Sequence, residues 1–119
     1  MRFMMLVKAT RDSEAGAAPN PQLMAAVTKL AEEATAIGAL ITGGGLRPSS
    51  QGVRICVANG KTSVTDGPFA ETKELVGGFA IFELESKEEA VQRGIKFMQI
   101  HADILGPSYQ GELEIRPMF

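Results

Sequence analysis

Two segments of this sequence are apolar at nearly every position, and they limit what the chain can fold into. They are Phe3–Val7 and Phe79–Leu84. Successive side chains of a strand point to opposite faces, so such a run predicts a strand that is covered on both sides. The sequence therefore predicts a sheet with two strands in protected, central positions.

Two amphipathic helices are expected to pack on this sheet. Asn20 caps the first, because its side chain can accept a free backbone N–H, and Pro21 tolerates the first helical position. Apolar residues then recur at spacings of four and three as far as Ile37, and Gly38 ends the pattern. Ser86–Glu89 is a capping-box sequence that begins the second helix. The predicted buried face of that helix is Ala90, Val91, Gly94, Phe97 and Met98.

The remaining strands are short and separated by turns. Val53–Thr65 alternates on each side of Asn59-Gly60, which is the strongest local signal for a β-hairpin because both turn positions need a positive φ. Cys56 falls on the opposite face of this hairpin from Val53, Ile55 and Val57. Further strands are expected within residues 39–48 and 112–119, and loops over residues 8–19 and 101–111.

The predicted order of elements is β-α-β, a hairpin, and β-α-β. Without the hairpin this is βαββαβ, the ferredoxin-like α+β plan, in a single domain of residues 1–119. The first and third core strands are central in that plan, and they coincide with the two apolar segments. Two helices cover only one face of such a sheet, so a second copy of the chain is expected on the other. The sequence thus predicts a homodimer.

Composition restricts the classes of binding partner and the cellular location that are expected for this protein. A net charge of −2 over 119 residues gives no electrostatic reason to bind nucleic acid or an anionic membrane directly. Cys56 is the only cysteine, which excludes an internal disulfide and favours a reducing, cytoplasmic location. The apolar run Phe3–Val7 is too short for a signal-peptide core or a membrane span.

Four features of the sequence are candidate sites. Gly43–Gly45 lacks the following helix that a phosphate-binding loop needs, so a bulge or a close backbone approach is favoured. One histidine and one cysteine do not make a zinc site, and no metal is expected. His101 could either offset a helix dipole or serve in acid–base chemistry. Thr65–Glu74, TDGPFAETKE, combines turn residues with charged ones and could be a plain turn or the rim of a site.

VTDGPFAETKELVGGF resembles the signature of the DGPF proteins, a branch of the YCII-related family. The segments GGGLRP, VRI with NGKTSVTDGPF, and GELEIRPMF stand where that family has matching segments, so the resemblance covers nearly the whole chain. Ser13–Pro19 and Leu105–Tyr109 are the least similar parts. The resemblance implies a dimeric α+β barrel, in which two ferredoxin-like subunits pack sheet to sheet beside a cleft that the motif loop lines.

The resemblance also implies two functional hypotheses. The wider family is similar to enzymes, including lyase-like proteins that act on halogenated aromatic rings, and a His–Asp pair is suspected in its members. The pair available here is His101 with Asp66, which would move a proton on a small anionic or phenolic substrate without a cofactor. Asp66 is then expected to be partly buried, beside a cation that lowers its pKa. The substrate-binding residues of this hypothesis are Phe69, Glu71, Lys73 and Arg116.

The alternative hypothesis is a binding module without chemistry. DGPF proteins are often associated with extracytoplasmic-function sigma factors, which implies a regulatory role. In this alternative the same cleft holds a ligand or a partner helix, and the homodimer is the functional unit.

Overall fold

The computed structural model describes residues 1–71 and 73–119. Four strands form an antiparallel sheet in the order β2-β5-β1-β6, and β3 and β4 form a separate two-stranded ribbon. The elements in chain order are β1 (Arg2–Lys8), α1 (Arg11–Glu14), α2 (Pro21–Ala36), β2 (Leu40–Gly45), η1 (Ser49–Gln51), β3 (Val53–Ala58), β4 (Lys61–Asp66), η2 (Thr72–Glu74), β5 (Val76–Glu83), α3 (Lys87–Leu105) and β6 (Leu113–Pro117).

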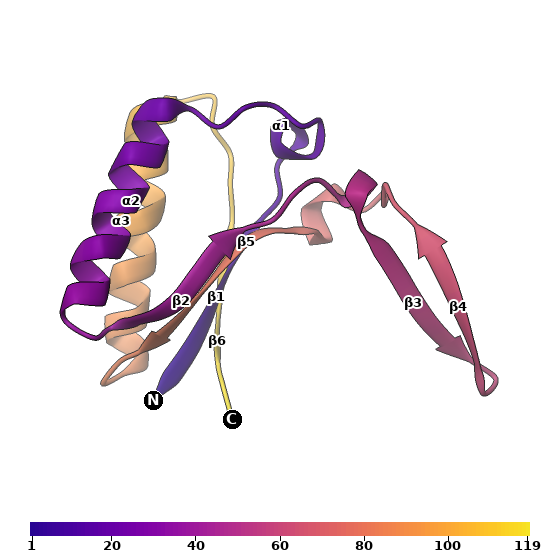
Figure 1. Ribbon diagram of the computed structural model, residues 1–119. Helices are drawn as coiled ribbons and strands as arrows, with labels where there is room; N and C mark the ends of the chain where they lie inside the picture. The colour runs from indigo at the N-terminus through magenta and orange to yellow at the C-terminus, as the bar shows by residue number, and fades with distance from the viewer.

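This arrangement confirms the predicted ferredoxin-like plan. The strands β1 and β5, which contain the two apolar segments, occupy the centre of the sheet, and β2 and β6 are its edges. Both long helices, α2 and α3, cover the same face (Figure 1). In the part of the chain that the structure describes, no helix has the length and apolar content that a bilayer span requires.

The core lies between the helices and alternate residues of the central strands. Phe3 and Met5 of β1 are 1% and 4% exposed, and their partners in the antiparallel register are Phe82 and Ala80 of β5. Gly94 lets α3 approach β6 closely, because a Cβ at this position would lie 2.9 Å from the nearest methyl carbon of Leu113. Small residues on the helices thus fix the spacing between the two layers.

Neither α2 nor α3 covers the opposite face of the sheet (Figure 1). Met4 pairs with Ile81 and Leu6 with Phe79, and each of these four side chains is only partly buried in one chain. Cross-strand partners project to the same side of a sheet, so these residues form one continuous apolar surface. We call Met4, Leu6, Phe79 and Ile81 the open face.

The predicted caps of the long helices are present. The Asn20 side chain accepts from the N–H of Gln22 at 2.9 Å and of Leu23 at 3.0 Å. Ser86 accepts from the N–H of Glu89 at 3.2 Å, but the Glu89 carboxylate accepts from Glu85 rather than from Ser86. The reciprocal half of the predicted capping box is therefore displaced by one residue.

Three local predictions were wrong. The expected loop after β1 contains α1, which Thr10 and Ser13 cap reciprocally. The second long helix does not end near His101 but continues to Leu105, where Gly106, with a φ of 88°, ends it. Val91 was expected to be buried and is 37% exposed, because it lies at the edge of the helical face that packs on the sheet.

The ribbon confirms the predicted hairpin. Asn59 and Gly60 have φ values of 52° and 74°, as a type I′ turn requires. The register pairs Ile55 with Val64, as a two-residue turn at Asn59-Gly60 requires. The ribbon extends away from the sheet on the side that the helices leave uncovered (Figure 1).

Candidate functional site

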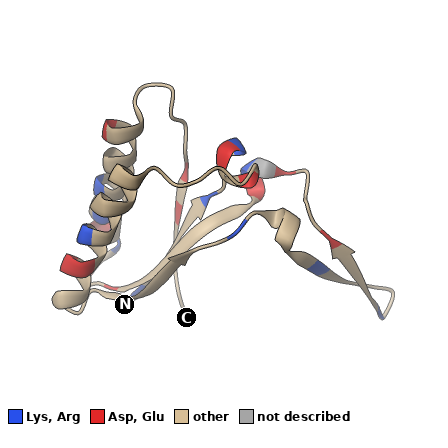
Figure 2. Cartoon of the chain, turned by 45° about the horizontal axis from the view of Figure 1, so that its top comes forward, with Lys and Arg blue, Asp and Glu red and all other residues tan. Residues whose placement is uncertain are grey.

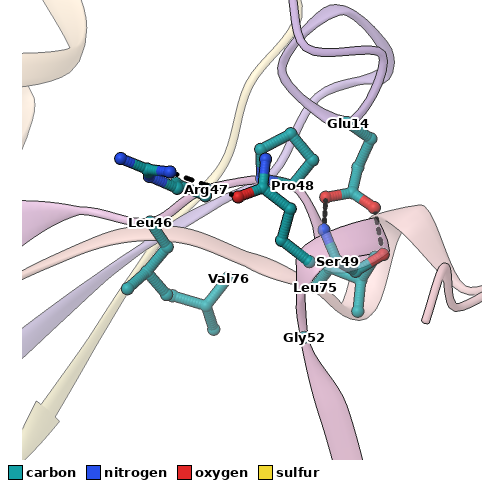
Figure 3. A pocket seen from close by; sticks show the side chains of 9 residues that line it. Glu14, Leu46, Arg47, Pro48, Ser49, Gly52, Leu75 and Val76 are labelled. Atoms are coloured by element: carbon teal, nitrogen blue, oxygen red, sulfur yellow. Dashed lines mark hydrogen bonds between the residues drawn. The ribbon is translucent and has the colours of Figure 1, made fainter. Parts of the chain in front are cut away.

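A cavity of about 360 Å³ lies beside the junction between the sheet and the ribbon (Figure 3). The end of β2, the short helix η1, the start of β5 and one residue of α1 surround it. Its lining residues are Glu14, Leu46, Arg47, Pro48, Ser49, Gln51, Gly52, Leu75 and Val76.

The three glycines of β2 place the chain against β5 just before this cavity. A Cβ on Gly43 would lie 2.9 Å from the carbonyl oxygen of Phe79, which is closer than backbone and side chain normally approach. The N–H of Leu46 then donates to the carbonyl of Gly77 at 2.9 Å. Gly43 therefore serves a close backbone approach, which is one of the two roles expected for these glycines.

Ser49 connects three segments that are distant in the sequence. Its N–H donates to one oxygen of the Glu14 carboxylate at 2.9 Å, and its hydroxyl donates to the other oxygen. The same hydroxyl accepts from the N–H of Phe69 at 3.1 Å. A serine hydroxyl has one proton to donate and lone pairs to accept, so both capacities are used here. Ser49 thus ties α1 and the TDGPFAETKE loop to the floor of the cavity.

Gly67 of that loop packs directly on the η1 backbone. Its N–H donates to the carbonyl of Gly52 at 2.9 Å. A Cβ on Gly67 would overlap the carbonyl oxygen of Ser49 and lie 2.6 Å from its carbonyl carbon. β4 ends at Asp66, and the Gly67-Pro68 that follows cannot continue the ladder, because proline has no backbone N–H.

Phe69 and Glu71 meet through a residue that the sequence did not single out. The Arg54 guanidinium lies 3.8 Å from the centre of the Phe69 ring, and its Nη1 is 3.4 Å from a Glu71 carboxylate oxygen. Phe69 is partly buried, and the geometry is that of a cation–π contact. The sequence feature that could have identified Arg54 is its position on the polar face of the hairpin, where it pairs with Thr65 at the start of the loop.

The proposed acid–base residues lie apart within one chain. Asp66 is exposed at the end of β4, whereas His101 is on α3 at the opposite side of the molecule (Figure 1). No ion pair among residues 1–71 and 73–119 includes Asp66. The expectation that Asp66 is partly buried is wrong, because it lies at the end of an exposed ribbon strand.

His101 is held by its own helix and by aromatic neighbours. Its Nδ1 donates to the carbonyl of Phe97 at 2.9 Å, one helical turn earlier. The ring centre lies 4.6 Å from that of Phe97 and 5.7 Å from that of Tyr109. Burial raises the pKa of Tyr109, because a phenolate is poorly solvated in this place. A shallower cavity of about 480 Å³ lies nearby, lined by Ile95, Met98, Gln99, Ala102, Tyr109, Gln110 and Gly111.

The two remaining predicted substrate-binding residues lie elsewhere again. Lys73 is exposed in η2. Arg116 belongs to β6, where its Nη1 is 3.1 Å from the Glu114 carboxylate, and Lys8 lies 3.3 Å from the other oxygen. The hydrogen bond from Arg116 and then that from Lys8 lower the pKa of Glu114. Neither Lys73 nor Arg116 lines the cavity beside η1.

The described residues contain no group of three or more His, Cys, Asp or Glu side chains that could hold a metal ion. A family model for the YCII-related domain matches residues 1–97. A search of the curated proteins found no match.

Proposed function

Because this chain belongs to the YCII-related family, we propose that it is a homodimer that binds a small anionic molecule in the cavity beside Arg47. The observation that carries the proposal is the cavity itself. Its volume of about 360 Å³ is at the lower end of what small-molecule sites occupy. It also combines an apolar wall with a few polar groups, which is the usual composition of such sites.

The apolar wall comes from two neighbouring strands and the turn between β2 and η1. Leu46 and Val76 project into the same side of the cavity (Figure 3), and Pro48 and Leu75 complete the wall. These residues would contact the hydrocarbon part of a ligand. A ring of benzene size fits within this volume, since an apolar cavity of about 150 Å³ already holds benzene.

Arg47 would bind the charged part of that ligand. Its Nη1 donates to the neutral side chain of Gln51 at 3.3 Å, and none of the ion pairs of the described residues includes it. Glu14 is the other charged residue of the cavity, but its carboxylate accepts from Ser49 and lies across Pro48 from Arg47 (Figure 3). The guanidinium can therefore donate to a ligand carboxylate or phenolate.

Binding without chemistry is the function that a single chain supports best. Neither Asp66 nor His101 lines the cavity, so the residues of the acid–base hypothesis would not reach a ligand there. An Asp66–His101 pair would have to form between two subunits. The TDGPFAETKE loop contacts a residue that lines the cavity, because the N–H of Phe69 donates a hydrogen bond to the Ser49 hydroxyl.

Isothermal titration with benzoate and with its neutral analogue benzamide tests this proposal. Benzoate is expected to bind at least about tenfold more tightly, because a hydrogen bond to a charged group contributes about 1.5–3 kcal/mol. Arg47→Gln should remove that preference, whereas the matched control Lys96→Gln, an exposed position on α3, should keep it. Equal affinity for the two compounds, or a preference that survives Arg47→Gln, would contradict the proposal.

A further inference from the structure

One face of the ribbon exposes a continuous row of β-branched apolar side chains. The exposed fractions are 57% for Val53, 69% for Ile55, 72% for Val57 and 67% for Val64. The three residues of β3 alternate along the strand, and Val64 is the cross-strand partner of Ile55, so all four project to one side. We call these four residues the ribbon face.

A ribbon with solvent on both sides would be expected to be polar on both sides. The opposite side of the same ribbon carries Arg54, Cys56, Ser63 and Thr65, so its two sides differ as the two sides of a half-buried sheet do. Neither β3 nor β4 pairs with the four-stranded sheet. A two-stranded hairpin by itself is marginally stable in water, so a ribbon of this composition is expected to be covered.

We propose that the ribbon is an arm whose apolar face packs against a second copy of this chain. The area of the ribbon face supports this choice of partner. Burying one valine or isoleucine side chain removes about 60–120 Å² from water, so the four partly exposed side chains offer roughly 250 Å². A stable interface needs about 800 Å² from each partner. The ribbon face is thus too small to hold a partner alone and must adjoin a larger apolar surface.

The open face of the sheet is that larger surface. Met4, Leu6, Phe79 and Ile81 lie on the side of the sheet that no helix covers, and the ribbon extends on the same side (Figure 1). A subunit that covered the open face would therefore stand within reach of the arm. Arg54 and Lys61 project to the polar side of the ribbon, whereas Asp66, the partner of Val53, projects to the side of the ribbon face (Figure 2), so one carboxylate would need to stay hydrated or find a partner at the edge of the contact. This inference rests on the homodimer of the proposed function and adds the arm to it.

Two matched double variants test the arm. Ile55→Asp with Val64→Asp places two carboxylates at a cross-strand pair on the ribbon face. Cys56→Asp with Ser63→Asp places the same two groups at the adjacent cross-strand pair, on the polar side. Both variants add two carboxylates to one cross-strand pair of the same ribbon. Adjacent pairs differ by about 1 Å in Cα spacing, so the unfolding measurements below also compare the repulsion within each pair. Far-ultraviolet circular dichroism and urea unfolding would establish that both variants are folded.

Sedimentation velocity over a dilution series would measure the dimer dissociation constant. The ribbon-face variant is expected to raise this constant at least about a hundredfold, since each dimer contains two arms, while the polar-side variant stays within about threefold of the wild type. A wild-type dimer that both variants leave intact would overturn the arm but not the homodimer or the cavity. A monomeric wild type would overturn the arm and the homodimer together, leaving benzoate binding as a separate question.

Discussion

Gly67→Ala would show whether the TDGPFAETKE loop is held against η1 as the structure describes. Neither Gly67 nor the control position Gly45 has a positive φ, so alanine is compatible with the backbone at both. The difference lies in the space around them. The added Cβ would overlap the Ser49 carbonyl at position 67, whereas no heavy atom lies within 4 Å of it at position 45.

The expected cost follows from what must move. The overlapping atoms belong to the backbone of η1, so no flexible side chain can swing aside. Relieving the overlap separates the loop from η1 and breaks the bonds from the N–H of Gly67 to Gly52 and from the N–H of Phe69 to Ser49. Two hydrogen bonds contribute about 2 kcal/mol, and overpacking a fixed contact adds about 1–3 kcal/mol. We therefore expect Gly67→Ala to lower the free energy of unfolding by about 3 kcal/mol or more.

Urea unfolding followed by circular dichroism would measure both variants beside the wild type. Gly45→Ala should leave the free energy of unfolding unchanged or raise it by up to about 1 kcal/mol, because alanine restricts the unfolded chain. If Gly67→Ala unfolds within about 0.5 kcal/mol of the wild type, the loop does not pack on η1 in this way. The argument that Ser49 positions the loop would then fail as well.

Two titrations check the electrostatics. Tyr109 is the only tyrosine, and its phenolate absorbance should appear above the ordinary pKa of 10.0, so the folded state loses stability as the pH rises through that raised value. Gly111→Ala, whose Cβ would overlap the Tyr109 hydroxyl, should expose the ring and return its pKa towards 10.0; an unchanged titration would contradict the packing. Glu114 should titrate below 4.5 by NMR, so its contribution to stability is present above that pH and is lost as the pH falls through the lowered pKa. Arg116→Gln should move the titration towards 4.5, and a pKa that stays low would exclude Arg116 as the principal cause.

The fold could be predicted where local chemistry determines it. Asn20 ends up as a cap because its side chain finds backbone donors two and three residues away. Asn59 and Gly60 form their turn because both adopt positive φ with little strain. The central strands could be identified because a strand that is apolar on both faces is favoured only where both faces are covered. Each of these signals acts within a few residues of the chain.

The site could not be predicted in the same way, because it depends on contacts between distant segments. Ser49 forms hydrogen bonds with Glu14, 35 residues away in the sequence, and with Phe69, 20 residues away. No local sequence pattern predicts these pairings. The motif indicated that the loop around Asp66 matters, but a motif does not fix distances to other elements. The acid–base hypothesis requires His101 beside Asp66, whereas the topology puts α3 and the ribbon at opposite sides of the chain (Figure 1).

The most direct test of the proposed function is a crystal structure of the protein soaked with para-bromobenzoate. The bromine gives an anomalous peak that locates the ligand independently of its electron density. The proposal predicts one peak inside the cavity, against Leu46 and Val76, with the carboxylate within hydrogen-bond distance of the Arg47 guanidinium. A bromine peak in the second cavity, beside Tyr109, would contradict the proposal. So would the absence of a bromine peak beside η1 if benzoate binds to the protein in solution.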